Sequence, residues 1–185
     1  MSILILGLLL WCAGHLFKRL APGLRAPMGN AGKGIVAVVL LASVVLMVWG
    51  YRSADVIQVY MPLPGMAHLN NLLMLFAVYL YGVGGTKGVL YTRMRHPMLW
   101  GTVIWSVAHL LVNGDLASII LFGGIGLWAL VQMALINRAA PWVRPTDARG
   151  PKGDLMNLGG TLVLYGLIVA VHIWLGYNPF AGVTA

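Results

Sequence analysis

The chain has 185 residues, of which 60% are hydrophobic and only 9% are charged. A soluble domain normally carries roughly 25% charged residues, so this much apolar surface could not be hidden in one soluble core. The composition therefore indicates an integral membrane protein that forms a single compact domain. The net charge of +8 would suggest a nucleic-acid partner for a soluble protein. Here the basic residues separate apolar segments, as membrane orientation requires, and we expect no nucleic-acid partner.

The acidic and sulfur residues restrict the chemistry further. The chain contains four aspartates and no glutamate, which disfavours a carboxylate general base inside the membrane. The single cysteine, Cys12, excludes an intrachain disulfide. The first apolar segment has no basic residue before it and no small-residue cleavage site before Lys18. It is therefore expected to be a retained transmembrane helix and not a signal peptide.

Six apolar segments follow one another along the chain, and they are long and continuous instead of alternating. Such segments predict transmembrane helices and not the strands of a barrel. The fold predicted is an all-α membrane protein, a six-transmembrane-helix bundle in one domain over residues 1–185. The fourth segment is the shortest and is expected to extend back through Arg93. The predicted helices lie at about 2–17, 35–51, 67–83, 97–112, 116–136 and 158–176.

The basic residues predict the orientation of these helices. Eleven of the twelve lie in the three loops after the first, third and fifth helices, and Arg52 is the exception. Because cytoplasmic loops carry an excess of Lys and Arg, those three loops are predicted to be cytoplasmic. Both termini are then predicted to be periplasmic.

Two connections have clear turn signals. Asn113-Gly114-Asp115 joins the fourth and fifth helices, which predicts a tight antiparallel hairpin with Asp115 as the N-cap of the following helix. The loop 139–157 is rich in proline and glycine and is expected to be irregular and to lie on the membrane surface.

Histidines are the candidate functional residues, because ionisable groups inside a bilayer are costly and usually functional. The topology places His15 and His96 near the cytoplasmic side, and His68, His109 and His172 towards the outer side. His96 and His109 are thirteen residues apart, about 20 Å along a straight helix, so they belong to different sites. His96 is also explained by a simple helix start at Arg95-His96-Pro97.

His109 is the strongest candidate for a cofactor ligand. Its helix face carries Trp105 and Thr102, and flat aromatic neighbours suit a porphyrin pocket with a neutral imidazole as axial ligand. The alternative is a histidine that is hydrogen-bonded to a neighbouring helix. Cys12 and His15 share a helix face and either bind a metal or haem or simply pack.

Three pieces of the sequence resemble one known family. They are the segment 95–101 (Arg-His-Pro-Met-Leu-Trp-Gly), the segment 108–115 (Ala-His-Leu-Leu-Val-Asn-Gly-Asp) and the stretch from Ala13-Gly14-His15 to Pro22. With these, the chain is similar to the NnrU family of bacterial inner-membrane proteins over nearly its whole length. The resemblance implies a multi-pass protein of the bacterial inner membrane whose only general partner is the lipid bilayer.

That family is named from genes near those for nitrite and nitric oxide reduction, and it is similar to the plant zeta-carotene isomerases. The resemblance therefore implies a b-type haem and either a role in denitrification or cis-trans isomerisation of an apolar polyene substrate. It carries over His109 and His15 as axial ligands, with His172 as the alternative partner of His109. His68, Arg95 and His96 are further candidates, and Arg95 would pair with a haem propionate on the cytoplasmic side. A non-enzymatic alternative is a haem- or metal-binding assembly factor for a membrane reductase complex.

The Arg-His-Pro motif also resembles membrane methyltransferases that use S-adenosylmethionine. Those enzymes continue with a glutamate and a tyrosine-rich segment. This chain has no glutamate, and no tyrosine lies between Ile136 and Tyr165. The departure disfavours methyl transfer.

Overall fold

The computed structural model describes residues 1–181, and this part of the chain is all-helical apart from one isolated β-bridge. Most of the elements are long apolar helices, with short helical turns between them. The elements are α1 (Ser2–Leu20), α2 (Pro22–Arg25), α3 (Gly29–Arg52), α4 (Met66–Thr86), η1 (Val89–Thr92), α5 (Pro97–Val112), α6 (Leu116–Ser118), η2 (Ile119–Gly123), α7 (Gly124–Ala139) and α8 (Pro151–Trp174).

All six predicted apolar segments form helices. Five helices are long and apolar enough to cross a membrane: α1, α3, α4, α8 and the continuous helix Leu116–Ala139. The sixth, α5, is apolar but has only 16 residues. The chain is therefore a helical membrane protein of several spans, as the composition predicts.

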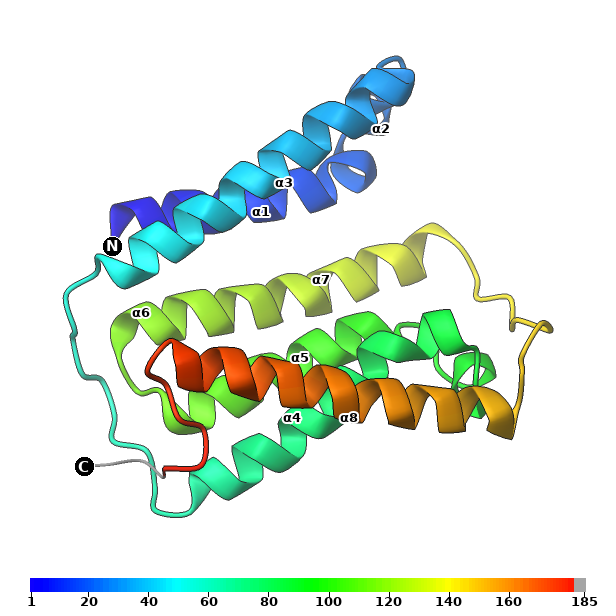
Figure 1. Cartoon of the computed structure of the whole chain (residues 1–185). Coiled ribbons are helices and arrows are strands. Elements are labelled where there is room, and N and C mark those ends of the chain that lie inside the picture. The colour runs from blue at the N-terminus through cyan, green and yellow to red at the C-terminus, as the bar shows by residue number, and fades with distance from the viewer. Residues whose placement is uncertain (182–185) are drawn as a thin grey trace.

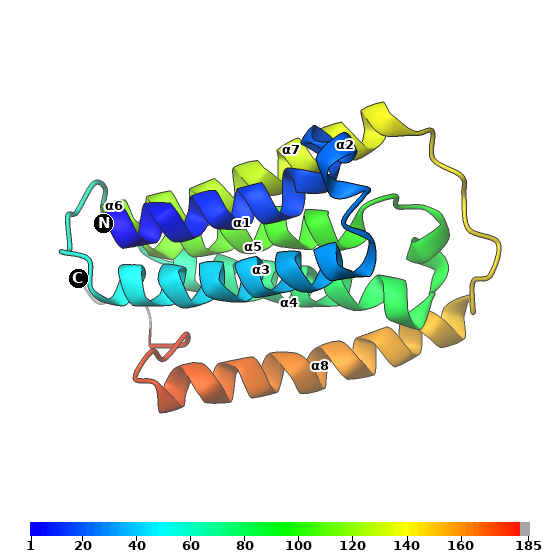
Figure 2. The ribbon, with the colours of Figure 1, turned by 90° about the horizontal axis from the view of Figure 1, so that it is seen from above.

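Three helices form the centre of the bundle, with the remaining helices on either side. Helix α5 packs against both α4 and α7. The hairpin of α1 and α3 lies beside α7 and reaches it mainly through α1, whereas α8 packs on α4 (Figures 1 and 2). Helices α5 and α8 both contact α4 but pack only slightly on each other.

The two ends of the bundle differ in charge. The N terminus, the loop 53–65, α6 and the end of α8 lie at one end (Figure 1). The other end holds α2, η1 and the loop 140–150, and it carries eleven of the twelve basic residues. This is the arrangement that the charge pattern predicts, and His15 lies towards the basic end of α1, whereas His109 and His172 lie at the opposite end of the bundle.

At the end of the bundle opposite the basic loops, backbone hydrogen bonds join the loop 53–65 to the turn before α6. Asp115 caps α6, as predicted, because its carboxylate accepts bonds from the Ser118 backbone N–H at 2.9 Å and the Ser118 hydroxyl at 2.6 Å. The loop 53–65 pairs with the same turn: the backbone N–H of Leu116 donates to the Ile57 carbonyl at 2.8 Å, and that of Val59 donates to the Gly114 carbonyl at 2.9 Å. The loop therefore holds the α5–α6 hairpin in place.

The helix after this turn changes its winding where it meets α5. Residues 119–123 form a π-helical turn, and the Phe122 carbonyl in it accepts a hydrogen bond from the buried Ser106 hydroxyl of α5. Gly126 lies against Ser106, where a Cβ would come within 2.9 Å of the Ser106 Cβ. The interhelical bond thus draws α5 and α7 into close contact, and π-turns of this kind often mark functional sites.

Two sequence expectations about helix ends are wrong. The fourth helix does not extend back through Arg93, because it begins at Pro97 after the 3₁₀ turn η1. The loop 139–157 is irregular only as far as Gly150, since α8 already begins at Pro151. Its first turns are polar but fixed: the Asp154 carboxylate accepts from the Val89 backbone N–H at 2.9 Å, and the Asn157 amide donates to the Tyr79 carbonyl at 2.9 Å.

The loop 140–150 is tied to α4 by an exposed ion pair between Lys87 and Asp147. The hydrogen bond with Asp147 raises the pKa of Lys87, and the same bond lowers the pKa of Asp147. The contribution of Asp147 to stability is therefore present above its unfolded-state pKa and lost as the pH falls through the lowered folded value. The contribution of Lys87 to stability is present below its unfolded-state pKa and is lost as the pH rises through its raised folded-state pKa.

From the directions of these two pKa shifts we predict that Asp147→Asn lowers thermal stability near pH 7. The effect should be small, because the ion pair is exposed. The difference from wild type should begin to shrink as the pH falls below about 4 and as it rises above about 10.5, because one partner then loses its charge. Thermal unfolding in detergent across this pH range measures it. Asp55 lies at the opposite end of the bundle and has no ion pair within residues 1–181, so Asp55→Asn is the control. A difference that does not depend on pH would contradict the prediction.

Candidate functional site

Three histidines inside the helices share one hydrogen-bonding arrangement. The Nδ1 atoms of His15, His109 and His172 bond to the backbone carbonyl four residues earlier, at 3.1, 2.8 and 2.7 Å. A carbonyl oxygen only accepts, so Nδ1 carries the proton in each ring and the neutral imidazole keeps a free lone pair on Nε2. This hydrogen bond fixes the ring and the tautomer, as the corresponding bond does in metal-binding histidines.

His109 lies in an aromatic cluster between α5 and the π-turn. Its ring stacks on Phe122 with 4.5 Å between ring centroids, and Trp105 lies 4.8 Å from it in a tilted arrangement. His172 lies in the last turn of α8, at the same end of the bundle as His109. The structure therefore places two histidines with oriented rings at one end of the bundle.

His15 lies in a second aromatic cluster, between α1 and α7. Its ring centroid is 4.1 Å from that of Trp11 and 4.6 Å from that of Trp128. Trp128 is six residues beyond Phe122 on the same continuous helix, which is about 9 Å of rise at ideal α-helical geometry and a different helix face. His15 and His109 thus contact different turns of this helix.

Arg95 and His96 are held by the end of α7. The Arg95 guanidinium donates to the Ala140 carbonyl at 2.7 Å and to the Ile136 carbonyl at 3.3 Å, and His96 Nε2 bonds to Asn137 Oδ1 at 2.8 Å. The Arg95 bonds satisfy backbone carbonyls at the end of α7, and the Asn137 side chain holds His96, so both side chains have partners without a cofactor. His68 is exposed in the first turn of α4. A cofactor role for Arg95, His96 and His68 stays a prediction.

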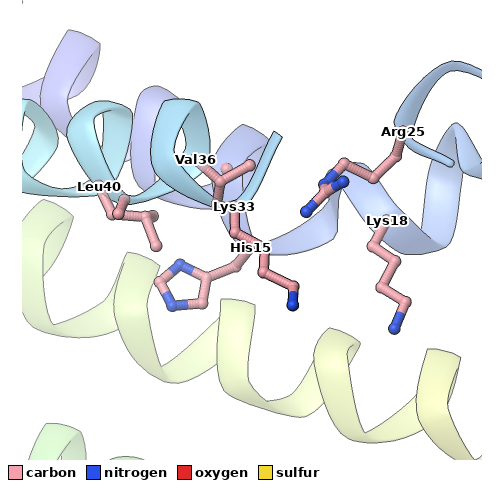
Figure 3. Close-up of a pocket in the computed structure, with 8 residues that line it drawn as sticks. His15, Lys18, Arg25, Lys33, Val36 and Leu40 are labelled. Atoms are coloured by element: carbon pink, nitrogen blue, oxygen red, sulfur yellow. The ribbon is translucent and has the colours of Figure 1, made fainter. Parts of the chain in front are cut away.

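A groove on the α1–α3 hairpin has His15 among its lining residues (Figure 3). It has a volume of about 390 Å³, and a second groove of about 380 Å³ adjoins it. Lys18, Arg25 and Lys33 line both grooves. In Figure 3, Leu40 and the His15 ring lie towards one side of the lining, Arg25 and Lys18 lie towards the other, and Lys33 lies beside His15.

Within residues 1–181, no three His, Cys, Asp or Glu side chains come together in a way that could hold a metal ion. His109, His15 and His172 therefore do not form one three-ligand metal site in this structure. Their predicted metal role is limited to ligation of a haem iron, which needs one or two imidazoles.

Sequence reasoning did not identify Phe122, which covers one face of His109, or Asp154 and Asn157, which join α8 to α4. Phe122 lies in an apolar run that looks like ordinary lipid-facing helix, and only the pairing of helices reveals its role. Asp154 gave a usable signal, since it is one of only four acidic residues in the chain.

Together, the apolar helices, the basic loops at one end and the oriented histidines within the spans define a polytopic helical membrane protein. The family model "NnrU protein" matches residues 3–179. The chain therefore belongs to the NnrU family, as the motifs predict. No curated protein and no solved structure matches it.

Proposed function

We propose that this protein binds a b-type haem, and that the imidazoles of His109 on α5 and His172 on α8 would hold it. The single observation behind the proposal is that both imidazole rings are oriented by the same kind of hydrogen bond. Each has Nδ1 bonded to a backbone carbonyl and a free Nε2, and both lie at the end of the bundle opposite the basic loops. A carbonyl-oriented neutral imidazole is the ligand form that haem iron takes.

The surroundings fit the same group. Aromatic rings of Trp105 and Phe122 flank His109, which suits the flat, apolar face of a porphyrin. The helices α5 and α8 pack on α4 and only slightly on each other, so a group between them would not break an existing helix interface. When bound, haem would supply one-electron chemistry, and the chain's own residues orient the imidazoles and exclude water.

The membrane setting proposed here is that of the bacterial inner membrane, crossed six times with both termini in the periplasm. Five helices have the required length, and α5 runs alongside them in the bundle (Figure 1). The basic loops at one end support the cytoplasmic assignment of that end. The haem would then lie in the outer half of the membrane.

Isomerisation of an apolar polyene, such as zeta-carotene, is the activity we propose for the haem. Its support is the resemblance of the family to the isomerases and the apolar interior, where Ala77, Ala108 and Ala129 are buried between central helices. A role in nitrite or nitric oxide reduction, as an assembly factor of the reductase, is the alternative. Conversion of a cis-carotene by the purified haem-loaded protein supports the isomerase, and haem binding without conversion supports the assembly factor.

The ligand assignment makes a direct prediction for the absorption spectrum of the purified, haem-loaded protein. His109→Ala and His172→Ala should each remove or shift the Soret band, because each loses one axial ligand. His15→Ala is the matched control, since His15 has the same local hydrogen bond but lies on α1, and it should keep the wild-type spectrum. Loss of the band in His15→Ala with an unchanged His172→Ala would make His15 the partner of His109. No Soret band in the wild type would contradict haem binding.

A further inference from the structure

The basic grooves on the α1–α3 hairpin are separate from the proposed haem ligands. They lie at the basic end of the bundle, whereas His109 and His172 lie at the other end. The two grooves share the basic side chains of Lys18, Arg25 and Lys33. The first groove is also lined by the apolar side chains of Val36, Ala37 and Leu40.

Within residues 1–181, the three basic side chains have no carboxylate partner. The chain has four acidic residues, and all of them lie elsewhere. Asp147 pairs with Lys87, and Asp154 accepts from the Val89 backbone. The other two acidic residues, Asp115 and Asp55, lie at the opposite end of the bundle. Three uncompensated positive charges around one groove attract an anion.

Arg25 is held in position before any ligand binds. Its guanidinium donates to the Gly29 carbonyl at 3.2 Å and lies over Gly32, where a Cβ would come within 2.9 Å of the Arg25 Cζ. The short helix α2 and the turn at Gly29, which has a φ of 51°, place it between Lys18 and Lys33. A fixed guanidinium loses little entropy when it binds a phosphate oxygen.

We propose that these grooves bind an anionic phospholipid, with its phosphate between Lys18, Arg25 and Lys33 and an acyl chain against Val36, Ala37 and Leu40. The proposal commits to a lipid because the charged end of the site lies at the basic face of the bundle and the apolar end continues into the span of α3. The hairpin of α1 and α3 lies at the outside of the bundle, a position that suits contact with a lipid (Figure 1).

The test uses the full-length protein in detergent, with native mass spectrometry of bound phosphatidylglycerol against phosphatidylcholine and inorganic phosphate. The variant Lys18→Gln/Arg25→Gln/Lys33→Gln should weaken phosphatidylglycerol binding by about a hundredfold, since each basic residue near the surface contributes a factor of about five. The control Arg138→Gln/Arg144→Gln/Lys152→Gln removes the same charge from the last turn of α7, the loop 140–150 and the first turn of α8, at the same end of the bundle, and should leave binding unchanged. Helical circular dichroism checks that both variants are folded.

Each other outcome overturns the proposal. Equal weakening in both triple variants would mean diffuse attraction to basic loops. Equal binding of phosphatidylcholine would mean that the site does not recognise the anionic headgroup. Equal binding of inorganic phosphate would mean that the acyl chain does not contribute to binding. Loss of the Soret band in the groove variant, with lipid binding unchanged, would mean that haem propionates occupy the groove. The spectrum of His109→Ala is independent of this experiment, so failure of the lipid site and failure of the haem proposal are distinguishable.

Discussion

Replacing Gly50 by alanine is expected to destabilise the protein by about 2 kcal/mol and to loosen the hairpin of α1 and α3. A Cβ at Gly50 would lie 2.7 Å from the Leu4 Cα and 2.8 Å from the Ile3 carbonyl carbon, and both atoms belong to backbone that cannot move aside. Overpacking of this kind costs about 1–3 kcal/mol, and the higher helix propensity of alanine returns only up to about 1 kcal/mol. The two helices must therefore separate.

The control for Gly50 lies in the same helix. Gly34 is exposed, and a Cβ there would meet nothing within 4 Å. Gly34→Ala should therefore be neutral or should stabilise α3 by up to about 1 kcal/mol. Thermal unfolding of both variants in the same detergent gives the comparison. Equal stability of the two variants would contradict the close contact of α1 with α3.

The second large effect is expected at Asp154, where removal of the carboxylate should cost about 2–3 kcal/mol. The half-buried side chain accepts from the Val89 backbone N–H through both oxygens, at 2.9 and 3.1 Å, and from the Tyr79 hydroxyl at 3.1 Å. In Asp154→Ala these donors lose their partner near the point where α8 meets α4 and η1. The first turns of α8 should then detach.

Hydrogen exchange and thermal unfolding can measure this change. Exchange in Asp154→Ala should increase over the first two turns of α8 and over η1, while α1 and α3 keep their protection. Asp154→Asn retains one acceptor oxygen and should lose less stability. Asp147→Asn removes a charge from an exposed position nearby and should have little effect at neutral pH. Uniform loss of protection throughout the chain would contradict a local role for Asp154.

The positions of the helices could be predicted from the sequence because apolar length is the main determinant of a membrane span. The cap at Asp115 was also predictable, since the Asn-Gly-Asp turn depends on local backbone chemistry. The start of α8 was not, because its polar first turns are stabilised by Val89 and Tyr79, which are far away in the sequence. The early helical start therefore depends on tertiary contacts and not on local hydropathy.

The candidate site could be predicted only in part. Apolar context and spacing identify His109, His172 and His15 as unusual residues, and the helix register predicts that each Nδ1 can reach a carbonyl one turn earlier. Which histidines lie near each other depends on helix neighbours, and the sequence does not specify those. The motif at Arg95 and His96 is the clearest example, since its side chains bond to the end of α7 instead of facing the histidines.

The central claim is that one haem iron is held by the imidazoles of His109 and His172. The electron paramagnetic resonance spectrum of the ferric, haem-loaded protein tests it most directly, because the spin state reports the number of strong axial ligands. We expect a low-spin ferric signal in the wild type and in His15→Ala, and a change to high spin in His172→Ala. A high-spin wild type, or a low-spin signal that persists in His172→Ala, would contradict it.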